Sequence, residues 1–272
     1  LPAEEILKTI PGLAYIREQD KVASMSAGSR RQVFLMDYMS RPPDNFYAEN
    51  PVKINRPGDL LYLISTSGST GIPKSVMVEH RTLVNLMSYQ LDRTGIDFSR
   101  VLQFAAIGFD VSLQEIFSAL LTGGTLYLPD NVIRNDVARL FDFITRNRIN
   151  ILFLPPAFLK SIFSERTYVR EFPRSVQHII AAGEQLIVNE PLRQLLKERG
   201  IYLHNHYGPS ETHVVTTLTI DPKGDTPRLP GIGKPVANTV IYILNMYGNP
   251  QPVGVVGELY IGGVQVGRGY LG

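Results

Sequence analysis

A stretch rich in serine, threonine and glycine ends in a lysine and contains the residue types that hold phosphate oxygens. It reads Ser-Thr-Ser-Gly-Ser-Thr-Gly-Ile-Pro-Lys over residues 65–74. The glycines allow close approach of the backbone, the hydroxyl and amide groups offer hydrogen-bond donors, and Lys74 adds a positive charge. These properties predict a phosphate-binding loop, although a surface loop can have the same composition.

This loop does not match the P-loop of nucleotide-binding phosphotransferases. The G-x-x-x-x-G-K-[ST] pattern requires glycine directly before the lysine, where this chain has Pro73. A P-loop also opens a helix whose N-terminus faces the phosphate, whereas residues 75–78 have the composition of a strand. The sequence therefore disfavours a P-loop phosphotransferase.

Two acidic residues further along the chain could serve the same chemistry. Asp110 follows the mostly apolar segment 104–109, where a lone carboxylate needs a cationic partner. Glu211 is either a solvated turn residue or a ligand of magnesium, a hard cation that suits carboxylate and phosphate oxygens. Ser112 and Glu115 have the S-x-x-E spacing of a helix capping box, so this segment could also simply begin a helix.

Composition excludes several other classes of function. The 272 residues are 44% hydrophobic and 19% charged, which is typical of a globular protein. A net charge of +2 without a dense basic run argues against nucleic acid as the partner. The chain has no cysteine, which excludes disulfides and thiolate catalysis, and its 5 histidines lack a zinc-binding spacing.

No segment predicts contact with a membrane. Apolar runs stay well short of the about 20 residues that cross a bilayer, and no signal peptide opens the chain. We therefore expect a cytoplasmic protein. Because the chain begins at Leu1 rather than methionine, we also expect it to be a fragment.

Alternating strand and helix patterns predict an α/β fold with layered, parallel-rich sheets flanked by helices. Strands are expected at 60–64, 75–78, 101–106, 125–128, 149–154, 176–181 and 202–204. Helices are expected at 83–91, 113–121, 137–147, 158–163 and 191–199.

Three regions follow from these patterns. Residues 1–57 hold a short helix at 4–10, a strand at 33–36 and a linker punctuated by prolines at 41–57. Residues 58–215 form the α/β core with the ligand pocket. Residues 216–272 have glycine- and proline-rich turns and short strands at 240–244 and 257–261, which predict a small β-rich subdomain.

Four segments, taken in order, resemble the signature motifs of adenylate-forming enzymes. The first is the loop at 65–74, which departs from the family signature at Ser65, where tyrosine is common, and at Ser75, where glycine is usual. Phe-Asp-Val-Ser follows at 109–112, and Asn-His-Tyr-Gly-Pro-Ser-Glu-Thr at 205–212 has serine in place of threonine. The last runs from Gly-Glu-Leu at 257–259 to Arg-Gly-Tyr at 268–270. The chain is identified as resembling the adenylation domain of a nonribosomal peptide synthetase.

The resemblance implies ATP and Mg²⁺ as cofactors. It assigns catalytic roles to Thr66, Lys74 and Glu211, and Glu211 would also hold the metal. Tyr207 would stack on adenine, with Asn205 at the adenine edge. The full set expected to bind ATP is Thr66, Ser67, Gly68, Ser69, Thr70, Gly71, Lys74, Gly183, Glu184, Asn205, Tyr207, Gly208 and Ser210.

The resemblance also places an amino-acid pocket, in which Asp110 binds the substrate's amino group. If buried, Gln114 and His206 must hydrogen-bond each other or water. The combination resembles that of domains that activate L-proline. The pocket positions carried over from the motifs are Asp110, Val111, Gln114, Phe153, Ile180, Ala182, His206, Val214 and Val215.

Partners and alternatives follow from the same resemblance. It implies transfer of the amino acid to phosphopantetheine on a peptidyl carrier domain, beside a condensation domain of the same synthetase. The family's Thr-Gly-Asp motif, hinge and small C-terminal domain do not occur in the chain, so we expect the chain alone to adenylate poorly. An acyl- or aryl-CoA ligase and a noncatalytic nucleotide-binding fragment are the alternatives.

Overall fold

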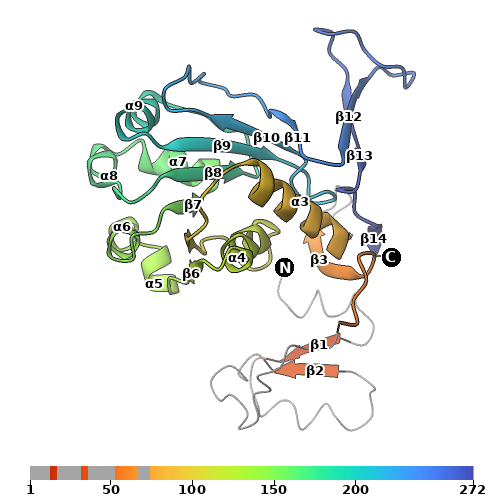
Figure 1. The fold of residues 1–272 in the computed structure, drawn as a ribbon, viewed down its shortest axis with the longest axis horizontal. Helices are drawn as coiled ribbons and strands as arrows, with labels where there is room; N and C mark the ends of the chain where they lie inside the picture. Colours follow the sequence, from red (N-terminus) through yellow and green to blue (C-terminus); the bar gives the residue numbers. More distant parts are fainter. Residues whose placement is uncertain (1–12, 17–31, 36–52, 67–73, 272) are drawn as a thin grey trace. The chain divides into compact units, whose positions relative to one another are not determined.

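A computed structural model describes residues 13–16, 32–35, 53–66 and 74–271 (Figure 1). The chain divides into two compact units, Leu1–Ile54 and Asn55–Gly272. In the first unit β1 (Leu13–Ile16) pairs in parallel with β2 (Gln32–Leu35), which is the strand expected at 33–36. The helix expected at 4–10 lies outside the described residues.

The second unit is built on a seven-stranded sheet with the order β11-β10-β9-β8-β7-β5-β6. The five neighbouring strands β6, β5, β7, β8 and β9 are parallel, which confirms the predicted parallel-rich α/β core. The strand β10 is antiparallel to β9, and β11 is antiparallel to β10. The bounds are β5 (Arg100–Leu102), β6 (Thr125–Tyr127), β7 (Ile151–Phe153), β8 (His178–Ala182), β9 (Tyr202–Tyr207), β10 (Thr216–Ile220) and β11 (Lys234–Pro235).

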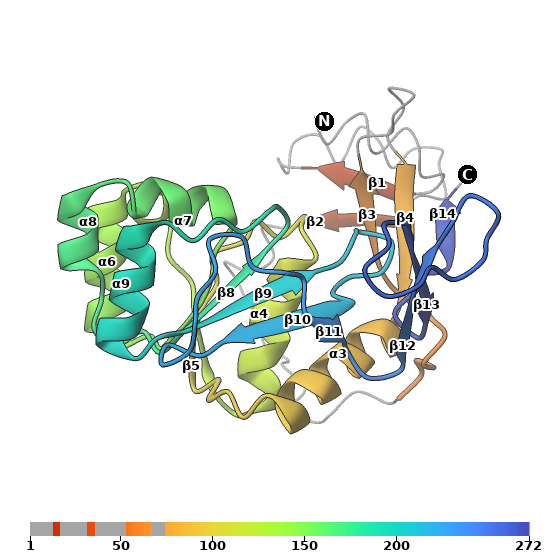
Figure 2. The same ribbon diagram turned by 90° about the horizontal axis from the view of Figure 1, so that it is seen from above.

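Helices connect the parallel strands and cover the sheet. In both views α6 to α9 lie together, apart from α3 and α4 (Figures 1 and 2). The bounds are α3 (His80–Arg93), α4 (Val111–Leu121), α5 (Asn131–Arg134), α6 (Val137–Arg146), α7 (Pro156–Ile162), α8 (Arg166–Glu171) and α9 (Glu190–Arg199). None of the helices within the described ranges is long and apolar enough to cross a bilayer.

Helix α9 shows how local sequence sets the helix ends. The Asn189 side chain accepts a hydrogen bond from the Leu192 amide at 3.1 Å, which satisfies a free donor of the first turn. Pro191 fits the first turn because its missing N–H would be unpaired there. Gly200 ends the helix with a φ of 68°, a conformation that glycine adopts without strain.

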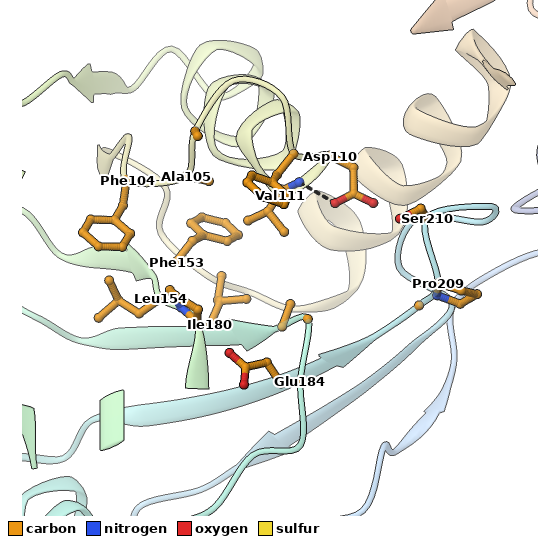
Figure 3. Close-up of a pocket in the computed structure, with 16 residues that line it drawn as sticks. Phe104, Ala105, Asp110, Val111, Phe153, Leu154, Ile180, Glu184, Pro209 and Ser210 are labelled. Atoms are coloured by element: carbon orange, nitrogen blue, oxygen red, sulfur yellow. Dashed lines mark hydrogen bonds between the residues drawn. The ribbon is translucent and has the colours of Figure 1, made fainter. Parts of the chain in front are cut away.

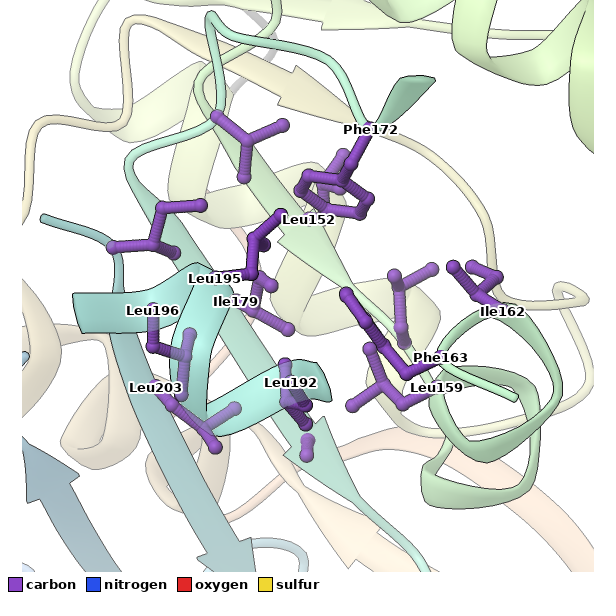
Figure 4. Packing of buried hydrophobic residues seen from close by; sticks show 14 of the residues in the cluster. Leu152, Leu159, Ile162, Phe163, Phe172, Ile179, Leu192, Leu195, Leu196 and Leu203 are labelled. Atoms are coloured by element: carbon purple, nitrogen blue, oxygen red, sulfur yellow. The ribbon is translucent and has the colours of Figure 1, made fainter. Parts of the chain in front are cut away.

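Alternate residues of the central strands are buried on opposite faces of the sheet. Leu152 and Ile179 belong to a cluster with side chains of α6, α7 and α9 (Figure 4). Ile151, Phe153 and Ile180 belong to a separate cluster that includes Ala119 of α4. The continuous apolar runs of β7 and β8 are therefore explained by burial on both faces, each large side chain contributing about 1.5–3 kcal/mol.

In the described part of the second unit, two smaller sheets lie outside the seven-stranded one. The strands β3 (Leu60–Thr66), β4 (Lys74–Glu79) and β14 (Gly269–Leu271) are antiparallel in the order β14-β4-β3. Arg268 donates to the buried Glu79 carboxylate at 3.0 Å and so attaches the start of β14 to the end of β4. The strands β12 (Thr239–Leu244) and β13 (Glu258–Gly263) form an antiparallel pair.

The structure differs from the predicted elements in ways that have physical causes. The strand expected at 101–106 ends at Leu102, because the next amides turn toward a side chain of α4. The strand expected at 202–204 continues to Tyr207 because β10 pairs with its full length. Residues 216–220 and 234–235 complete the seven-stranded sheet, so within residues 216–272 the strands outside this sheet begin only at β12.

Candidate active site

A cavity of about 580 Å³ lies at the carboxyl ends of the parallel strands, beside the start of α4 (Figure 3). Segments that follow β5, β7, β8 and β9 form its walls together with the first residues of α4. This edge of an open α/β sheet is the usual place for a ligand, since loops from several strands meet there. Of the expected substrate-binding residues, the cavity is lined by Asp110, Val111, Phe153, Ile180 and Ala182.

Asp110 provides one of the two acidic side chains that line this cavity, at the N-terminus of α4, and Glu184 is the other. One carboxylate oxygen, Oδ1, accepts from the Val111 amide at 2.8 Å and so caps the helix. The capping-box interpretation of Ser112 and Glu115 is wrong, because Ser112 lies inside the helix and its hydroxyl donates to the Phe109 carbonyl at 2.7 Å. Beside apolar walls, the half-buried carboxylate favours a cationic ligand group.

The charge of Asp110 acts on two further side chains, Tyr62 and His213. Burial raises the pKa of Tyr62 well above its usual range, and the negative charge of Asp110 adds to this shift. Burial lowers the pKa of His213, whereas Asp110 acts in the opposite direction. Within the described part of the chain, neither the Tyr62 hydroxyl nor His213 Nε2 has a hydrogen-bond partner. A neutral tyrosine and a neutral histidine therefore leave the charge of Asp110 available to a ligand.

Gln114 and His206 are both buried and hydrogen-bond each other, as expected. Gln114 Nε2 lies 3.2 Å from His206 Nδ1 and also donates to Gln90 Oε1 at 2.5 Å. Burial, followed by the charge of His213, lowers the pKa of His206 to about 3. The imidazole is thus neutral near pH 7, and its Nδ1 accepts the proton of the Gln114 amide.

Some expected pocket residues are buried and do not line the cavity. Gln114 is fully buried, and Val214 packs with Leu83, Leu86 and Met87 of α3 in a separate apolar cluster. Val215 is also fully buried. These buried positions line neither this cavity nor a second one that adjoins it.

A second cavity of about 450 Å³ adjoins the first and shares a wall with it. The shared residues are Gly183, Glu184, Gly208 and Pro209. Most of the second cavity's wall consists of residues expected to bind ATP or the substrate, namely Gly183, Glu184, Asn205, His206, Tyr207 and Gly208. Ser210, also expected to contact ATP, lines the first cavity.

Asn205 connects this second cavity to a loop that the sequence did not single out. Its Nδ2 donates to the Gly231 carbonyl at 2.9 Å. The neighbours of that glycine, Pro230 and Ile232, line the cavity. Sequence reasoning missed these residues because a proline- and glycine-rich turn carries no signal for a ligand.

Gly208 closes the turn between the two cavities. A Cβ atom at this position would lie 1.6 Å from the His213 carbonyl oxygen. The close approach arises because the chain reverses here, and the Val215 amide donates back to the Tyr207 carbonyl at 2.8 Å. Only glycine fits, since a backbone oxygen cannot move away as a flexible side chain can.

Three of the recognised motifs meet around Tyr270. Its hydroxyl donates to Glu211 Oε1 at 2.5 Å, and the Lys74 ammonium lies 5.4 Å from the centre of its ring. The hydrogen bond to Glu211 raises the pKa of Tyr270. The pairing of β14 with β4 produces this arrangement, because it sets Tyr270 opposite Val76.

The remaining phosphate-loop residues can be placed only in part. Thr66 donates to the Lys74 carbonyl at 3.3 Å, so the loop connects two paired antiparallel strands. The other loop residues with expected roles lie outside the described residues, and they are Ser67, Gly68, Ser69, Thr70 and Gly71.

Glu211 suits a magnesium ion that is shared with phosphates. Its carboxylate is partly exposed and lies in the same cluster as Lys74. Across the described ranges, no group of three or more acidic, histidine or cysteine side chains could hold a metal by itself. Magnesium needs no such cage, because it is commonly bound by one or two carboxylates together with substrate phosphates.

Comparisons with known proteins agree with this geometry. Residues 7–271 match the family described as AMP-binding enzyme. The chain is 55% identical over 219 residues to gramicidin S synthase 2 of Brevibacillus brevis, and the match covers 80% of this chain and 5% of that protein. It is 56% identical over 219 residues to tyrocidine synthase 2 of Brevibacillus parabrevis, and this match covers 80% of this chain and 6% of that protein. The chain thus spans only a small part of these relatives.

A solved structure shows the same fold. The N-terminal subdomain of Klebsiella oxytoca NpsA, in complex with 3-hydroxybenzoyl-AMSN, superimposes with a TM-score of 0.74. The two sequences are 22% identical, and the match covers 98% of this chain and 66% of that one. The chain therefore belongs to the AMP-binding enzyme family, which confirms its recognition as an adenylation domain of the nonribosomal peptide synthetase type.

Proposed function

We propose that the protein containing this chain activates an amino acid by adenylation. A substrate carboxylate oxygen bonds to the α-phosphorus of ATP, and the bond from that phosphorus to pyrophosphate breaks. The observation that carries this proposal is the pair of adjoining cavities, one apolar with Asp110 and one lined by Asn205 and Tyr207. Two ligands, one in each cavity, would come close to each other at the shared wall around Gly208.

The cavity geometry gives each side chain a part in this reaction. Asp110 lies between the aromatic end of the cavity, with Phe104 and Phe153, and the end with Pro209 and Ser210 (Figure 3). An ammonium held by Asp110 would direct the substrate side chain toward the aromatic end and its carboxylate toward Ser210. Such alignment lowers the entropic part of the barrier to joining two anions.

The second cluster serves the phosphates. Lys74 would contribute a positive charge beside the triphosphate, and Thr66 a hydroxyl at the start of the loop. Magnesium held by Glu211 and the phosphates would neutralise charge on the departing pyrophosphate. No protein nucleophile is needed, which agrees with a chain without cysteine.

We further propose L-proline as the amino acid. Val111, Phe153 and Ile180 offer a compact apolar surface to a small ring, and Asp110 offers a charge partner to a secondary ammonium. The activated prolyl group would pass to phosphopantetheine of a peptidyl carrier domain, beside a condensation domain, in a cytoplasmic synthetase. A mass increase of one prolyl residue on the holo carrier, absent on the apo carrier, would support this transfer.

ATP–pyrophosphate exchange by the complete protein that carries this sequence tests the proposal. We expect exchange that depends on proline and is weak with other amino acids. Tetrahydrofuran-2-carboxylate, in which an ether oxygen replaces the ring nitrogen, should support little exchange because it cannot pair with Asp110. Exchange with another amino acid would overturn the proline assignment alone. Preference for the ether acid would favour an acyl-ligase function, and no exchange would favour a nucleotide-binding segment.

Replacing Phe153 by leucine tests whether the Phe153 side chain limits the size of the substrate ring that the cavity accepts. The smaller side chain should favour piperidine-2-carboxylate, whose ring has one more methylene than proline. We expect the ratio of kcat/KM for the two acids to shift by about tenfold or more toward the larger ring. Phe172→Leu is the matched control, because Phe172 is equally buried but packs in the cluster of α6, α7 and α9. An equal shift in the control would contradict the assignment.

A further inference from the structure

Helix α4 carries a fully buried carboxylate that the proposed reaction does not use. Glu115 Oε1 accepts from the Phe104 amide at 3.0 Å and from the Ala105 amide at 3.0 Å. Oε2 accepts from the Ala105 amide at 3.2 Å and from Gln103 Nε2 at 3.1 Å. Every partner donates a proton, so only a group with two acceptor oxygens satisfies the whole set.

The backbone that Glu115 holds is part of the cavity wall. Phe104 and Ala105 line the amino-acid cavity at its aromatic end. The same residues leave the sheet after β5 ends at Leu102, so the carboxylate replaces the neighbouring strand as their hydrogen-bond partner. The position of this wall therefore depends on one side chain.

The helix that holds Glu115 also carries Asp110, one of the two acidic residues of the cavity. Asp110 and Val111 stand at its first turn and line the cavity, whereas Glu115 lies just over one turn further along. The wall at Phe104 and Ala105 is thus tied to the same rigid helix as Asp110. This connection sets the spacing between the aromatic end and the site for the ammonium.

We propose that Glu115 is a positioning residue of the amino-acid pocket, whose ionised carboxylate holds the Phe104–Ala105 wall at the right distance from Asp110. The inference rests on the proposed amino-acid activation. It predicts an effect on the KM for the amino acid and little effect on the KM for ATP, because Glu115 contacts no residue of the second cavity in the hydrogen bonds above.

The ionisation of Glu115 gives the pocket a dependence on pH. Burial raises the pKa of Glu115 to about 7, against the opposing effects of the Ala105 and Phe104 amides, Gln103 and Arg134. Arg134 on α5 is the charged group whose field acts on this carboxylate, and it contacts Gln103 Oε1 at 3.0 Å.

Two effects of pH with opposite signs follow. Because the pKa is higher in the folded protein than its ordinary value of 4.5, the contribution of Glu115 to stability decreases as pH rises from about 4.5 through about 7. The protonated carboxyl accepts fewer hydrogen bonds from the wall. Affinity for the amino acid should therefore increase as pH rises through the pKa.

The test measures pyrophosphate exchange by the complete protein between about pH 6 and about pH 8.5, with proline and ATP each varied. In the wild type, the KM for proline should fall several-fold with rising pH while the KM for ATP stays level. Glu115→Gln places an amide N–H₂ against donors, so the KM for proline should rise about tenfold or more and lose its pH dependence. Glu198→Gln, at an exposed position of α9, is the control and should match the wild type.

A second variant decides the matter if Glu115→Gln does not fold. Gln103→Met keeps the size of the side chain but removes a hydrogen bond that lowers the pKa of Glu115. The midpoint of the proline KM profile should then move to higher pH. An unchanged midpoint, or a Glu115→Gln variant that raises both KM values equally, would overturn the positioning role. A wild type without amino-acid-dependent exchange would overturn the proposed function as well.

Discussion

Replacing Asp110 by asparagine should lower kcat/KM for proline in pyrophosphate exchange by at least about 100-fold, because an unpaired charge in a partly buried site costs about 3–5 kcal/mol. The substrate ammonium would meet a neutral amide among apolar walls. Asparagine is an equally good N-cap residue, so α4 should keep its first turn. The loss would then report on the missing charge and not on a damaged helix.

Asp136→Asn is the matched control for this experiment. Asp136 is likewise an N-cap aspartate, although it accepts from the amide three residues along, that of Arg139 at 3.1 Å, and it lines neither cavity described above. Its exchange activity should stay within about twofold of the wild type, as for most surface substitutions. A loss below about threefold in Asp110→Asn would remove the ammonium role from this residue.

Replacing Gly208 by alanine should abolish most activity by a steric effect. The added Cβ atom would stand 1.6 Å from the His213 carbonyl oxygen, so the turn that carries Pro209 and Ser210 must open. Misplacement of reacting groups by about 1 Å can reduce rates about 100-fold, and we expect a loss of at least that size. Because Gly208 lines both cavities, kcat/KM should fall for proline and for ATP alike.

Gly224→Ala provides the control for the glycine variant. At that position the nearest atom to a new Cβ is the Asp221 carbonyl oxygen at 3.4 Å, which is an ordinary contact. Both variants should also be compared by limited proteolysis, which detects unfolding separately from a local shift. Gly208→Ala with normal exchange would show that the turn between the cavities tolerates a different shape.

Prediction from sequence succeeded where a segment's own pattern decides its structure. The apolar runs of β7 and β8 and the periodic pattern of α6 identify buried strands and an amphipathic helix without knowledge of their partners. The Asp110 motif likewise occurs where a helix begins at the carboxyl edge of a sheet. For such positions the residue type and its place after a strand are enough to predict a ligand-binding role, since the carboxyl ends of parallel strands share one edge of the sheet.

Prediction from sequence failed where partners far away in the chain determine the structure of a segment. The expected strand at 101–106 stops at Leu102 because Glu115, ten or more residues away, accepts hydrogen bonds from the Phe104 and Ala105 amides. Residues 216–220 join the main sheet because β9 presents an open edge to them. Neither outcome can be predicted from the local amino-acid composition.

The sequence by itself determined the α/β class, the order of the motifs and the residue types available for phosphate, ammonium and magnesium. The tertiary structure decided which of them meet, since Tyr270 reaches Glu211 and Lys74 only through the pairing of β14 with β4. It also buried Gln114 and Val214 away from the cavity lining and bonded Glu115 to the Phe104 amide of the wall. The physical reason is that periodicity and propensity act over a few residues, whereas burial and hydrogen-bond satisfaction are settled between segments far apart in the chain.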